Sequence, residues 1–374
     1  MATDVIRSAK LKLLQLPLPN PISDAKVLTG RQKPLTHVAI VVAELATEEG
    51  LQGLGFSYSK RAGGRGMFAH AAEIVDELAG EDPSDIARIW TKLTWAGASV
   101  GRSGIATQAI AAFDVALWDL KSKRAGLPLA KLIGAERDAV PCYNTSGGFL
   151  SSPIDEVIEQ VSGLLEAGIG GIKLKVGHPD HRVDIERVEA VREAIGPDVP
   201  LMVDANQQWD RASALRMGRA LEPYTLVWIE EPLDAYDTVG HAQLAGTLDT
   251  PIATGEMLTS VDEHRTLIEA EAADFLQPDA PRVGGITPFL TIATMARLAN
   301  LALAPHFAME LHVHLAATYP GVTWVEHFDW LEALFNERLE IREGNLVVPD
   351  RPGLGLSLSD VSERWIVEQH VVSP

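Results

Sequence analysis

From about residue 139 onward the sequence alternates short β-branched segments with longer amphipathic ones, and this alternation limits the fold more than any other feature. Eight segments are typical of strands: AVPCYN, GGIKLK, PLMVD, LVWIE, PIATGE, DFLQPD, LALAPH and VTWVE. Amphipathic segments such as PIDEVIEQVSGLLEAG and RVDIERVEAVREAIG separate them. Eight strands with seven intervening helices predict an α/β fold, a (β/α)7β TIM-like barrel that lacks one helix. A doubly wound sheet would show the same alternation of strands and helices. In a dinucleotide-binding sheet, however, the glycine-rich turn follows a strand, whereas the glycines of GIGGIK precede one, so that turn is not present.

The first third of the chain has a different pattern, in which strands come first and helices follow. KLKLLQLPL, HVAIVVAEL and LQGLGFSYS are strand-like, and the clearest helix runs from about Gly104 to Arg124 with Gly126 as its stop. Elements grouped in this way favour a separate α+β domain. We therefore predict an N-terminal α+β domain over residues 1–135 and a barrel over 136–326. The C-terminal segment, 327–374, loses the alternation and is expected to return to the first domain.

Composition excludes several classes of protein. The 374 residues carry a net charge of −19, which argues against non-specific binding to nucleic acid or to an anionic membrane. An anionic substrate would consequently need a locally basic pocket. The single cysteine, Cys142, excludes an intrachain disulfide and a cysteine-based zinc cluster. With no signal-peptide pattern at the N-terminus and no apolar run long enough to span a bilayer, we expect a soluble cytoplasmic protein.

Three successive predicted strands each end in a carboxylate, and such ends meet at the catalytic face of a barrel. Asp204, Glu230 and Glu256 are spaced by 26 residues each, about one strand–helix unit. One acid after a strand is usually a helix cap, but three in phase would repel one another without a cation. Mg²⁺ accepts a few carboxylates and completes its shell with water and substrate, so we predict a Mg²⁺ site. Glu231 faces the other way by strand alternation and is expected to be structural.

Acid–base groups follow the strands on both sides of this cluster. Asp279 and His306 end neighbouring strands, so the carboxylate is expected to hold one imidazole nitrogen while the other faces the centre. Lys173 and Lys175 share one face of their strand, and Lys175 should have a lowered pKa because a second ammonium and a dication lie near it. A base on each side of a metal-bound substrate predicts removal and return of a proton next to a carboxylate.

The chain resembles the mandelate racemase subgroup of the enolase superfamily over essentially its whole length. The elements KLK, VDAN, IEEP, GE, PDxxRVGG and PHF occur in the family's order and at barrel spacing. The resemblance implies that the first domain caps the barrel mouth. It further implies that Lys175 and His306 are the acid–base pair and that Asp279 orients the histidine. Lys173 and Glu326 would bind the substrate carboxylate. Asp204, Glu230 and Glu256 would bind Mg²⁺.

Within that subgroup the chain is most similar to dehydratases of six-carbon acid sugars. The similarity lies in SDAKVLTGRQKPLT, GFSYSKRAGG, VGRSG, VDANQQWD, EEPLDAYD and APHFAMELH. A diacid sugar has a second carboxylate far from the metal, and Lys or Arg suits it through charge-assisted hydrogen bonds. Glycines 63, 64 and 66 suggest a mobile lid beside these residues. The implied substrate-binding residues, most of them in the first domain, are Asp24, Ala25, Lys26, Lys60, Arg61 and Asn206.

The sequence thus predicts an Mg²⁺-dependent enzyme that dehydrates a small diacid sugar by taking the proton alpha to a carboxylate, with competing epimerisation. Dehydration of another sugar acid, such as L-fuconate, and a pure racemase or epimerase of the same subgroup remain alternatives. A sugar-acid-binding protein without chemistry would require a missing catalytic residue, and a scaffold would leave the in-phase carboxylates unexplained. We expect a homo-oligomer that binds neither nucleic acid nor membrane.

Overall fold

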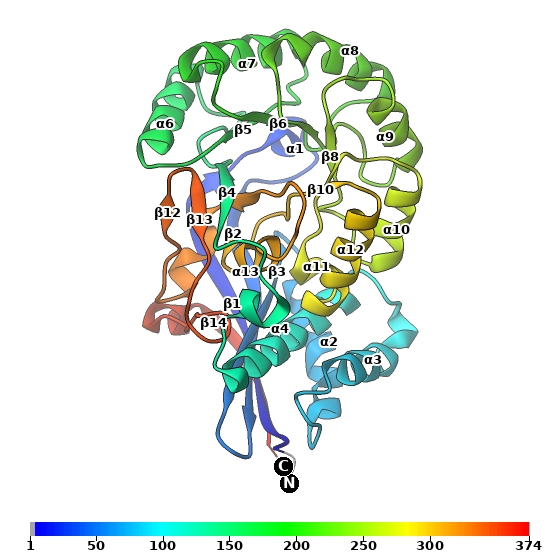
Figure 1. Ribbon diagram of the computed structural model, residues 1–374, viewed down its shortest axis with the longest axis vertical. Helices are drawn as coiled ribbons and strands as arrows, with labels where there is room; N and C mark the ends of the chain where they lie inside the picture. The colour runs from blue at the N-terminus through cyan, green and yellow to red at the C-terminus, as the bar shows by residue number, and fades with distance from the viewer. Residues whose placement is uncertain (1–3, 374) are drawn as a thin grey trace.

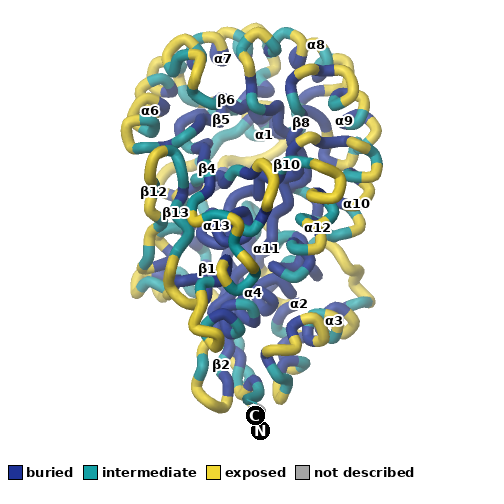
Figure 2. The backbone as a smooth tube through the Cα atoms, in the orientation of Figure 1, coloured by how far each residue is buried: buried dark blue, intermediate teal, exposed yellow. Residues whose placement is uncertain are grey.

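The computed structural model describes residues 4–373, and these fold into a barrel joined to a sheet-and-helix domain (Figure 1). The barrel strands are largely buried, while the outer faces of the surrounding helices are largely exposed (Figure 2). The α/β fold expected from the sequence, a barrel with an N-terminal α+β capping domain, is confirmed.

The barrel consists of the strands expected from the alternation. Neighbours in space are neighbours in sequence from β4 to β10, all parallel. The ring closes because β11 pairs with β4 and the segment just before β11 bridges to β10 through Thr323 and Leu303. The strands are β4 (Ala139–Asn144), β5 (Ile172–Lys175), β6 (Leu201–Asp204), β7 (Ile229–Glu230), β8 (Ile252–Thr254), β9 (Phe275–Leu276), β10 (Ala302–Leu303) and β11 (Val325–His327).

One main helix crosses each gap between consecutive barrel strands. Several of these helices start at an N-cap side chain that accepts a backbone N–H bond, as Asp180, Asp210 and Ser260 do. At Ser260 the residue three positions later, Glu263, bonds back to the capping segment. The helices are α6 (Ile154–Glu166), α7 (His181–Ile195), α8 (Arg211–Leu221), α9 (Thr238–Ala245), α10 (Val261–Glu269), α12 (Ile286–Leu298) and α13 (Met309–Ala316), with the short α11 (Ala280–Val283) and η3 (Glu222–Tyr224) between them.

The capping domain packs a four-stranded antiparallel sheet, in the order β14-β1-β2-β3, against helices. Helix α4 is buried on most sides because it lies between this sheet and the barrel, and it ends at Gly126 in the left-handed conformation. The elements are β1 (Ile6–Ile22), α1 (Ala25–Leu28), β2 (Leu35–Thr47), β3 (Gln52–Lys60), α2 (Gly64–Ile74), η1 (Val75–Leu78), α3 (Ile86–Ala96), η2 (Ala98–Val100), α4 (Ile105–Ala125) and α5 (Leu129–Ile133).

After the barrel, the chain contacts the capping domain through η4 and through Phe335, whose ring centre lies 5.5 Å from that of Phe56, and it then adds a hairpin to the barrel. Strand β13 pairs antiparallel with β4, so this part of the segment extends the barrel sheet. The last strand then pairs with β1. The exact domain boundaries remain a prediction. The elements are η4 (Asp329–Leu334), β12 (Ile341–Arg342), β13 (Asn345–Val347), η5 (Asp360–Trp365) and β14 (Ile366–Val372).

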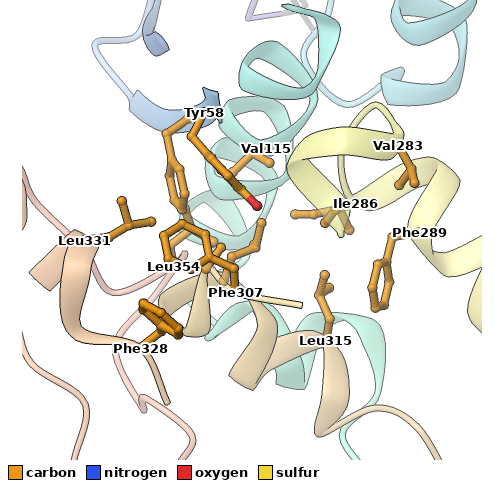
Figure 3. Close-up of a cluster of buried hydrophobic side chains, with 14 of the residues drawn as sticks. Tyr58, Val115, Val283, Ile286, Phe289, Phe307, Leu315, Phe328, Leu331 and Leu354 are labelled. Carbon is orange, nitrogen blue, oxygen red and sulfur yellow. The ribbon is translucent and has the colours of Figure 1, made fainter. Parts of the chain in front are cut away.

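The two domains share one hydrophobic core. Tyr58 of β3 and Val115 of α4 belong to the same buried cluster as Ile286, Phe289 and Phe307 of the barrel, and Figure 3 shows these side chains gathered between the elements. Because apolar area buried between the domains is removed from water, this core holds the capping domain at a fixed place on the barrel.

The glycines after Arg61 begin a helix instead of a mobile lid. Gly63, with φ of 102°, is the N-cap of α2. A Cβ at Gly64 would lie 2.3 Å from the Cβ of Ala39. The glycine at position 64 therefore permits close contact between α2 and β2.

Candidate active site

A cavity of about 270 Å³ lies where the carboxyl ends of the barrel strands meet the capping domain. Residues of strand β3 and of the segment around α1 form the wall of the cavity that the capping domain supplies, and α1 lies near β5 and β6 in Figure 1. Polar side chains from both domains line it: Asp24, Lys26, Lys60 and Arg61 from the capping domain, and Lys173, Lys175, Asn206, Glu256, Arg282, His306 and Glu326 from the barrel.

The structure brings the carboxylates of Asp204, Glu230 and Glu256 together, and of these three Glu256 lines the cavity. One oxygen from each lies within 4.8 Å of the others, and all three side chains are buried. The strand register explains the arrangement, because Asp204 pairs with Glu230 on the neighbouring strand. Two N–H donors hold one oxygen of Glu230, from Trp228 at 3.0 Å and from Gln277 at 2.7 Å.

The charges of this cluster fit a divalent cation. Burial, together with the other carboxylates, raises the pKa of Glu230 to about 8 even though Lys173 opposes the rise. Oxygen ligands that converge at this spacing are those that Mg²⁺ accepts, and a dication removes the repulsion between them. Glu231 lies outside the cluster and accepts a bond from Gln207 at 2.8 Å, which agrees with a structural role.

Lys173 lies among carboxylates and not in solvent. Its ammonium is 2.6 Å from Glu230 and 2.9 Å from Glu326, and its side chain is 1% exposed. Burial lowers its pKa, but these neighbours outweigh burial and raise the pKa well above the ordinary value. Glu326 also accepts bonds from Thr145 at 2.6 Å and from the Phe307 N–H at 2.8 Å. Lys173 is therefore a fixed positive charge beside the carboxylate cluster.

Lys175 points into the cavity beside Lys173, but its pKa shifts in the opposite direction to the one expected from the sequence. Its ammonium donates to Asp204. Burial and Lys173 lower the pKa of Lys175, yet the Asp204, Glu230 and Glu256 carboxylates outweigh them and raise it overall. The sequence argument for a lowered pKa included a dication beside these carboxylates. The charges of the protein itself, without that dication, raise the pKa of Lys175. Asn206, bonded to Asp204 through its N–H at 2.8 Å, completes this wall.

On the opposite side of the cluster, Asp279 and His306 are brought together as the sequence argument expects. Asp279 Oδ2 lies 2.8 Å from His306 Nδ1, so the carboxylate fixes the proton on Nδ1. Nε2 then carries a lone pair, and it lies 3.3 Å from the ammonium of Lys60 and 3.3 Å from Glu256. Burial lowers the pKa of Lys60 to about 8. The imidazole is thus oriented with its free nitrogen toward the cavity.

The capping residues implied by the family resemblance are not equivalent in the structure. Lys60 reaches His306 and so lies nearer the reacting centre than expected. Arg61 is held at the rim, with an ion pair to Asp24 at 3.4 Å and a bond to the Lys33 carbonyl at 3.0 Å. Lys26 lines the cavity, whereas the Ala25 side chain is buried and does not line it.

Sequence reasoning missed two groups beside the dyad, the buried Tyr58 and the half-buried Arg282. The Tyr58 hydroxyl donates to Asp279, and the Arg282 guanidinium lines the cavity with its Nε 3.9 Å from Asp279. The sequence could have indicated Tyr58, because its side chain and that of Lys60, a predicted site residue, point to the same face of β3. A signal also existed for Arg282, the arginine of the PDxxRVGG element.

Family models match both domains of the chain. Residues 28–134 match the mandelate racemase/muconate lactonizing enzyme N-terminal domain, and residues 156–362 match the enolase C-terminal domain-like family. The chain belongs to the mandelate racemase/muconate lactonizing enzyme family. The resemblance noted in the sequence is thereby confirmed, and the protein is an enolase-superfamily enzyme.

Members of this family resemble the chain over its whole length. L-talarate/galactarate dehydratase of Salmonella typhimurium strain LT2 is 65% identical over 362 residues, 97% of this chain and 91% of that protein. The crystal structure of the dehydratase from Salmonella typhimurium LT2 liganded with Mg and L-lyxarohydroxamate has a TM-score of 0.99 at 63% identity, covering 100% of this chain and 95% of that one. L-Talarate dehydratase from Polaromonas sp. JS666, complexed with Mg and L-glucarate, has a TM-score of 0.97 at 67% identity, covering 99% and 100%.

Within residues 4–373, no helix combines the length and the apolar character that crossing a membrane requires.

Proposed function

We propose that this protein is an Mg²⁺-dependent hydro-lyase that converts L-talarate and galactarate into a 4-deoxy-5-keto aldarate, with competing epimerisation. The observation that carries the proposal is the pair of candidate bases, Lys175 and His306, on opposite sides of three buried carboxylates. The high identity to L-talarate/galactarate dehydratase supports the choice of substrate.

Each base has a partner that fixes its orientation. Lys175 donates to Asp204, and Asp279 holds His306 through Nδ1, so that Nε2 faces the cavity, 3.3 Å from Lys60 and 3.3 Å from Glu256. Because the two bases face a bound substrate from opposite sides, either can take the proton from the carbon alpha to a carboxylate. Epimers at that carbon present their protons to opposite sides, so one active site accepts both and can return the proton on either face.

Dehydration then follows from loss of the β-hydroxyl. The electron pair of the broken C–H bond moves toward the carboxylate, the β C–O bond breaks, and the oxygen leaves as water with a proton from His306. His306 holds that proton either because it took the alpha proton itself or, where Lys175 is the base, because it began the step as the imidazolium. The resulting enol tautomerises to the keto acid. Bound Mg²⁺ supplies positive charge that stabilises the negative charge developing on the substrate carboxylate. Lys173 adds a second fixed positive charge at the same place.

The substrate's far carboxylate lies toward the capping domain in this proposal. Lys26, Arg61 and Arg282 give the cavity positive charge on that side, in a protein whose net charge is −19. A cap for an arylacid such as mandelate would be apolar on this side instead. A racemase or epimerase would share the two bases and differ only in keeping the β-hydroxyl.

A substrate panel tests the proposal. With Mg²⁺ present, we expect keto-acid formation from L-talarate and galactarate, slower turnover of the mono-acid galactonate, and little or none of L-fuconate or mandelate. Keto acid from L-fuconate alone would favour the other dehydratase. Exchange of the alpha proton in D₂O without loss of water from any acid would favour the epimerase.

Variants of the two bases test the mechanism. Lys175→Ala and His306→Asn should each lower turnover by at least roughly 10²–10⁴-fold, the usual contribution of a general base. Each variant should keep alpha-proton exchange in D₂O only for the epimer served by the remaining base. Near-normal turnover in both variants would contradict the two-base mechanism.

We also propose that the chain forms a homo-oligomer. Trp95 and Val100 are 65% and 67% exposed within one short stretch of the capping domain, and apolar side chains so placed favour contact with another protein surface. Sedimentation velocity would give the size, and a monomer at micromolar concentration would contradict the proposal.

A further inference from the structure

A tyrosine of the capping domain reaches the Asp279–His306 dyad of the barrel. Tyr58 lies near the end of β3, and its side chain is fully buried. Figure 3 shows it beside Phe307, the residue that follows His306, and the two rings are 4.7 Å apart in a tilted arrangement. The ring is thus held by packing, and only its hydroxyl is left to make a specific polar contact.

That hydroxyl lies within hydrogen-bond distance of both members of the dyad, and the Arg282 guanidinium lies close to it as well. It donates to Asp279 Oδ2, the oxygen that also accepts from His306 Nδ1 at 2.8 Å, and it lies 3.3 Å from Nδ1 itself. The other oxygen of Asp279 accepts the backbone N–H of Arg282 at 3.2 Å. Burial and the Asp279 charge raise the pKa of Tyr58 well above its ordinary value, so the phenol remains a donor.

We propose that Tyr58 is a positioning residue that completes a Tyr58–Asp279–His306 relay across the boundary between the domains. A carboxylate held from one side only can rotate about its last bond, and rotation of Asp279 would turn the imidazole with it. The phenol and the Arg282 N–H hold the two oxygens from different directions, and the plane of the carboxylate is thereby fixed. The capping domain then sets the direction of His306 Nε2 as well as the shape of the cavity.

The relay contacts only one of the two bases. Among the described residues, the hydrogen bonds of the Lys175 ammonium and the Tyr58 hydroxyl share no partner, because Lys175 bonds to Asp204. A loss of the hydroxyl should therefore slow proton transfer on the His306 face and leave the Lys175 face nearly unchanged. This reasoning rests on the proposed function, in which epimeric substrates present their alpha protons to opposite bases.

The test compares the holoenzyme with its Tyr58→Phe variant, which keeps the ring and removes the hydroxyl. We expect the rate of alpha-proton exchange in D₂O from one epimer, L-talarate or galactarate, to fall by about 10-fold or more, as for a lost hydrogen bond to a charged group. Exchange from the other epimer, and KM for both, should stay within about twofold of wild type. The affected epimer should be the one whose alpha-proton exchange is abolished by His306→Asn. Equal losses for both epimers, or no loss for either, would overturn the proposal.

Tyr319→Phe is the matched control. Tyr319 is also buried, and its hydroxyl donates to the Leu301 carbonyl at 2.5 Å, away from the cavity. This variant should lose some thermal stability and keep the wild-type ratio of the two alpha-proton exchange rates. A wild-type enzyme that turns over neither epimer would refute the proposed function, whereas a wild-type enzyme active on both makes the Tyr58 comparison decisive.

Two further measurements separate a positioning role from a merely structural one. In an Asp279→Asn background, adding Tyr58→Phe should change the ratio of alpha-proton exchange rates by less than about twofold, because coupled residues are non-additive. If Tyr58→Phe does not fold, trifluorotyrosine at position 58 keeps the shape and strengthens the donor. It should still shift the ratio for the His306-face epimer, and an unchanged ratio would overturn the proposal.

Discussion

At the scale of single residues, Lys60 and Arg61 show how neighbours in sequence can have different roles. Lys60 ends strand β3 and points to His306, with its ammonium 4.6 Å from the centre of the Phe307 ring. Arg61 has a positive φ of 66° and turns away to Asp24 at the rim. The change of direction follows from the end of the strand, since the alternation of side chains stops there.

The two residues should therefore have separable effects on catalysis. Lys60→Met removes a charge beside His306 and should lower kcat for diacids and mono-acids alike, by roughly 10- to 150-fold. Arg61→Leu should mainly raise KM for the diacids, because it changes the rim and not the dyad. Steady-state kinetics with galactarate and galactonate distinguish them. Identical kinetic changes in both variants would contradict this separation.

The carboxylate cluster makes a prediction about metal binding. Glu230→Gln keeps the shape of the side chain and removes one negative charge from the set that includes Asp204 and Glu256. We expect Mg²⁺ affinity, measured by isothermal titration calorimetry, to fall by at least about 10-fold, since carboxylate oxygens are the ligands that Mg²⁺ prefers. Chelation should abolish wild-type turnover and added Mg²⁺ should restore it. Full activity after exhaustive chelation would contradict the metal site.

At the scale of secondary structure, the position of β3 depends on glycines. A Cβ at Gly55 would lie 2.0 Å from the Ala112 carbonyl oxygen of helix α4, and one at Gly53 would lie 2.4 Å from the Ala116 carbonyl oxygen. Only glycine allows the strand to lie this close to the helix. The distance matters for the site because the same strand carries Tyr58 into the core.

Gly55→Ala should therefore be strongly destabilising. The backbone oxygen cannot move without shifting the helix, and overpacking of a core costs about 1–3 kcal/mol or more in the free energy of unfolding. Gly163 is the control, because a Cβ there would meet no atom within 4 Å. Gly163→Ala in helix α6 should be neutral or stabilising by up to about 1 kcal/mol. Differential scanning calorimetry would show the contrast, and equal melting temperatures would contradict it.

Some parts of the fold and of the site can be predicted from the sequence, and others cannot. The barrel strands and their terminal carboxylates were predictable because the hydrophobic alternation locates each strand and its end. The contact of Tyr58 with Asp279 was not, because it depends on how the capping domain docks on the barrel. The lowered Lys175 pKa stays a prediction for the protein with its dication bound, whereas in the protein alone the carboxylates of Asp204, Glu230 and Glu256 raise that pKa.

At the scale of the whole molecule, a buried carboxylate joins the two domains. Asp114 of α4 accepts the Thr287 N–H at 2.9 Å and the Thr287 hydroxyl at 2.6 Å, near the start of barrel helix α12. Burial raises the pKa of Asp114 to about 7, although these bonds oppose the rise. The folded state therefore binds a proton at Asp114 more tightly than the unfolded state, whose pKa is the ordinary 3.8.

This linkage gives a pH dependence of stability with a definite sign. A raised pKa contributes stability that is present below pH 3.8 and is lost as the pH rises through about 7. Asp114→Asn does not titrate, so its stability relative to wild type should improve as the pH rises from about 4.5 to 7 and level off above 8, by a few kcal/mol at most. Denaturant unfolding of both proteins at several pH values measures this. Parallel curves would contradict it.

The pairing of β14 with β1 affects how the molecule is made. Strand β1 of the capping sheet is synthesised before the barrel, but its partner β14 is synthesised only after the entire barrel. Until then the outer edge of β1 has unpaired backbone groups, which can pair with a strand of another nascent chain. A translation product that stops after the barrel would carry Lys175, His306 and all three metal-binding carboxylates and still present this open edge. The cell would therefore clear such a fragment as an aggregation hazard and would not obtain a smaller working enzyme from it.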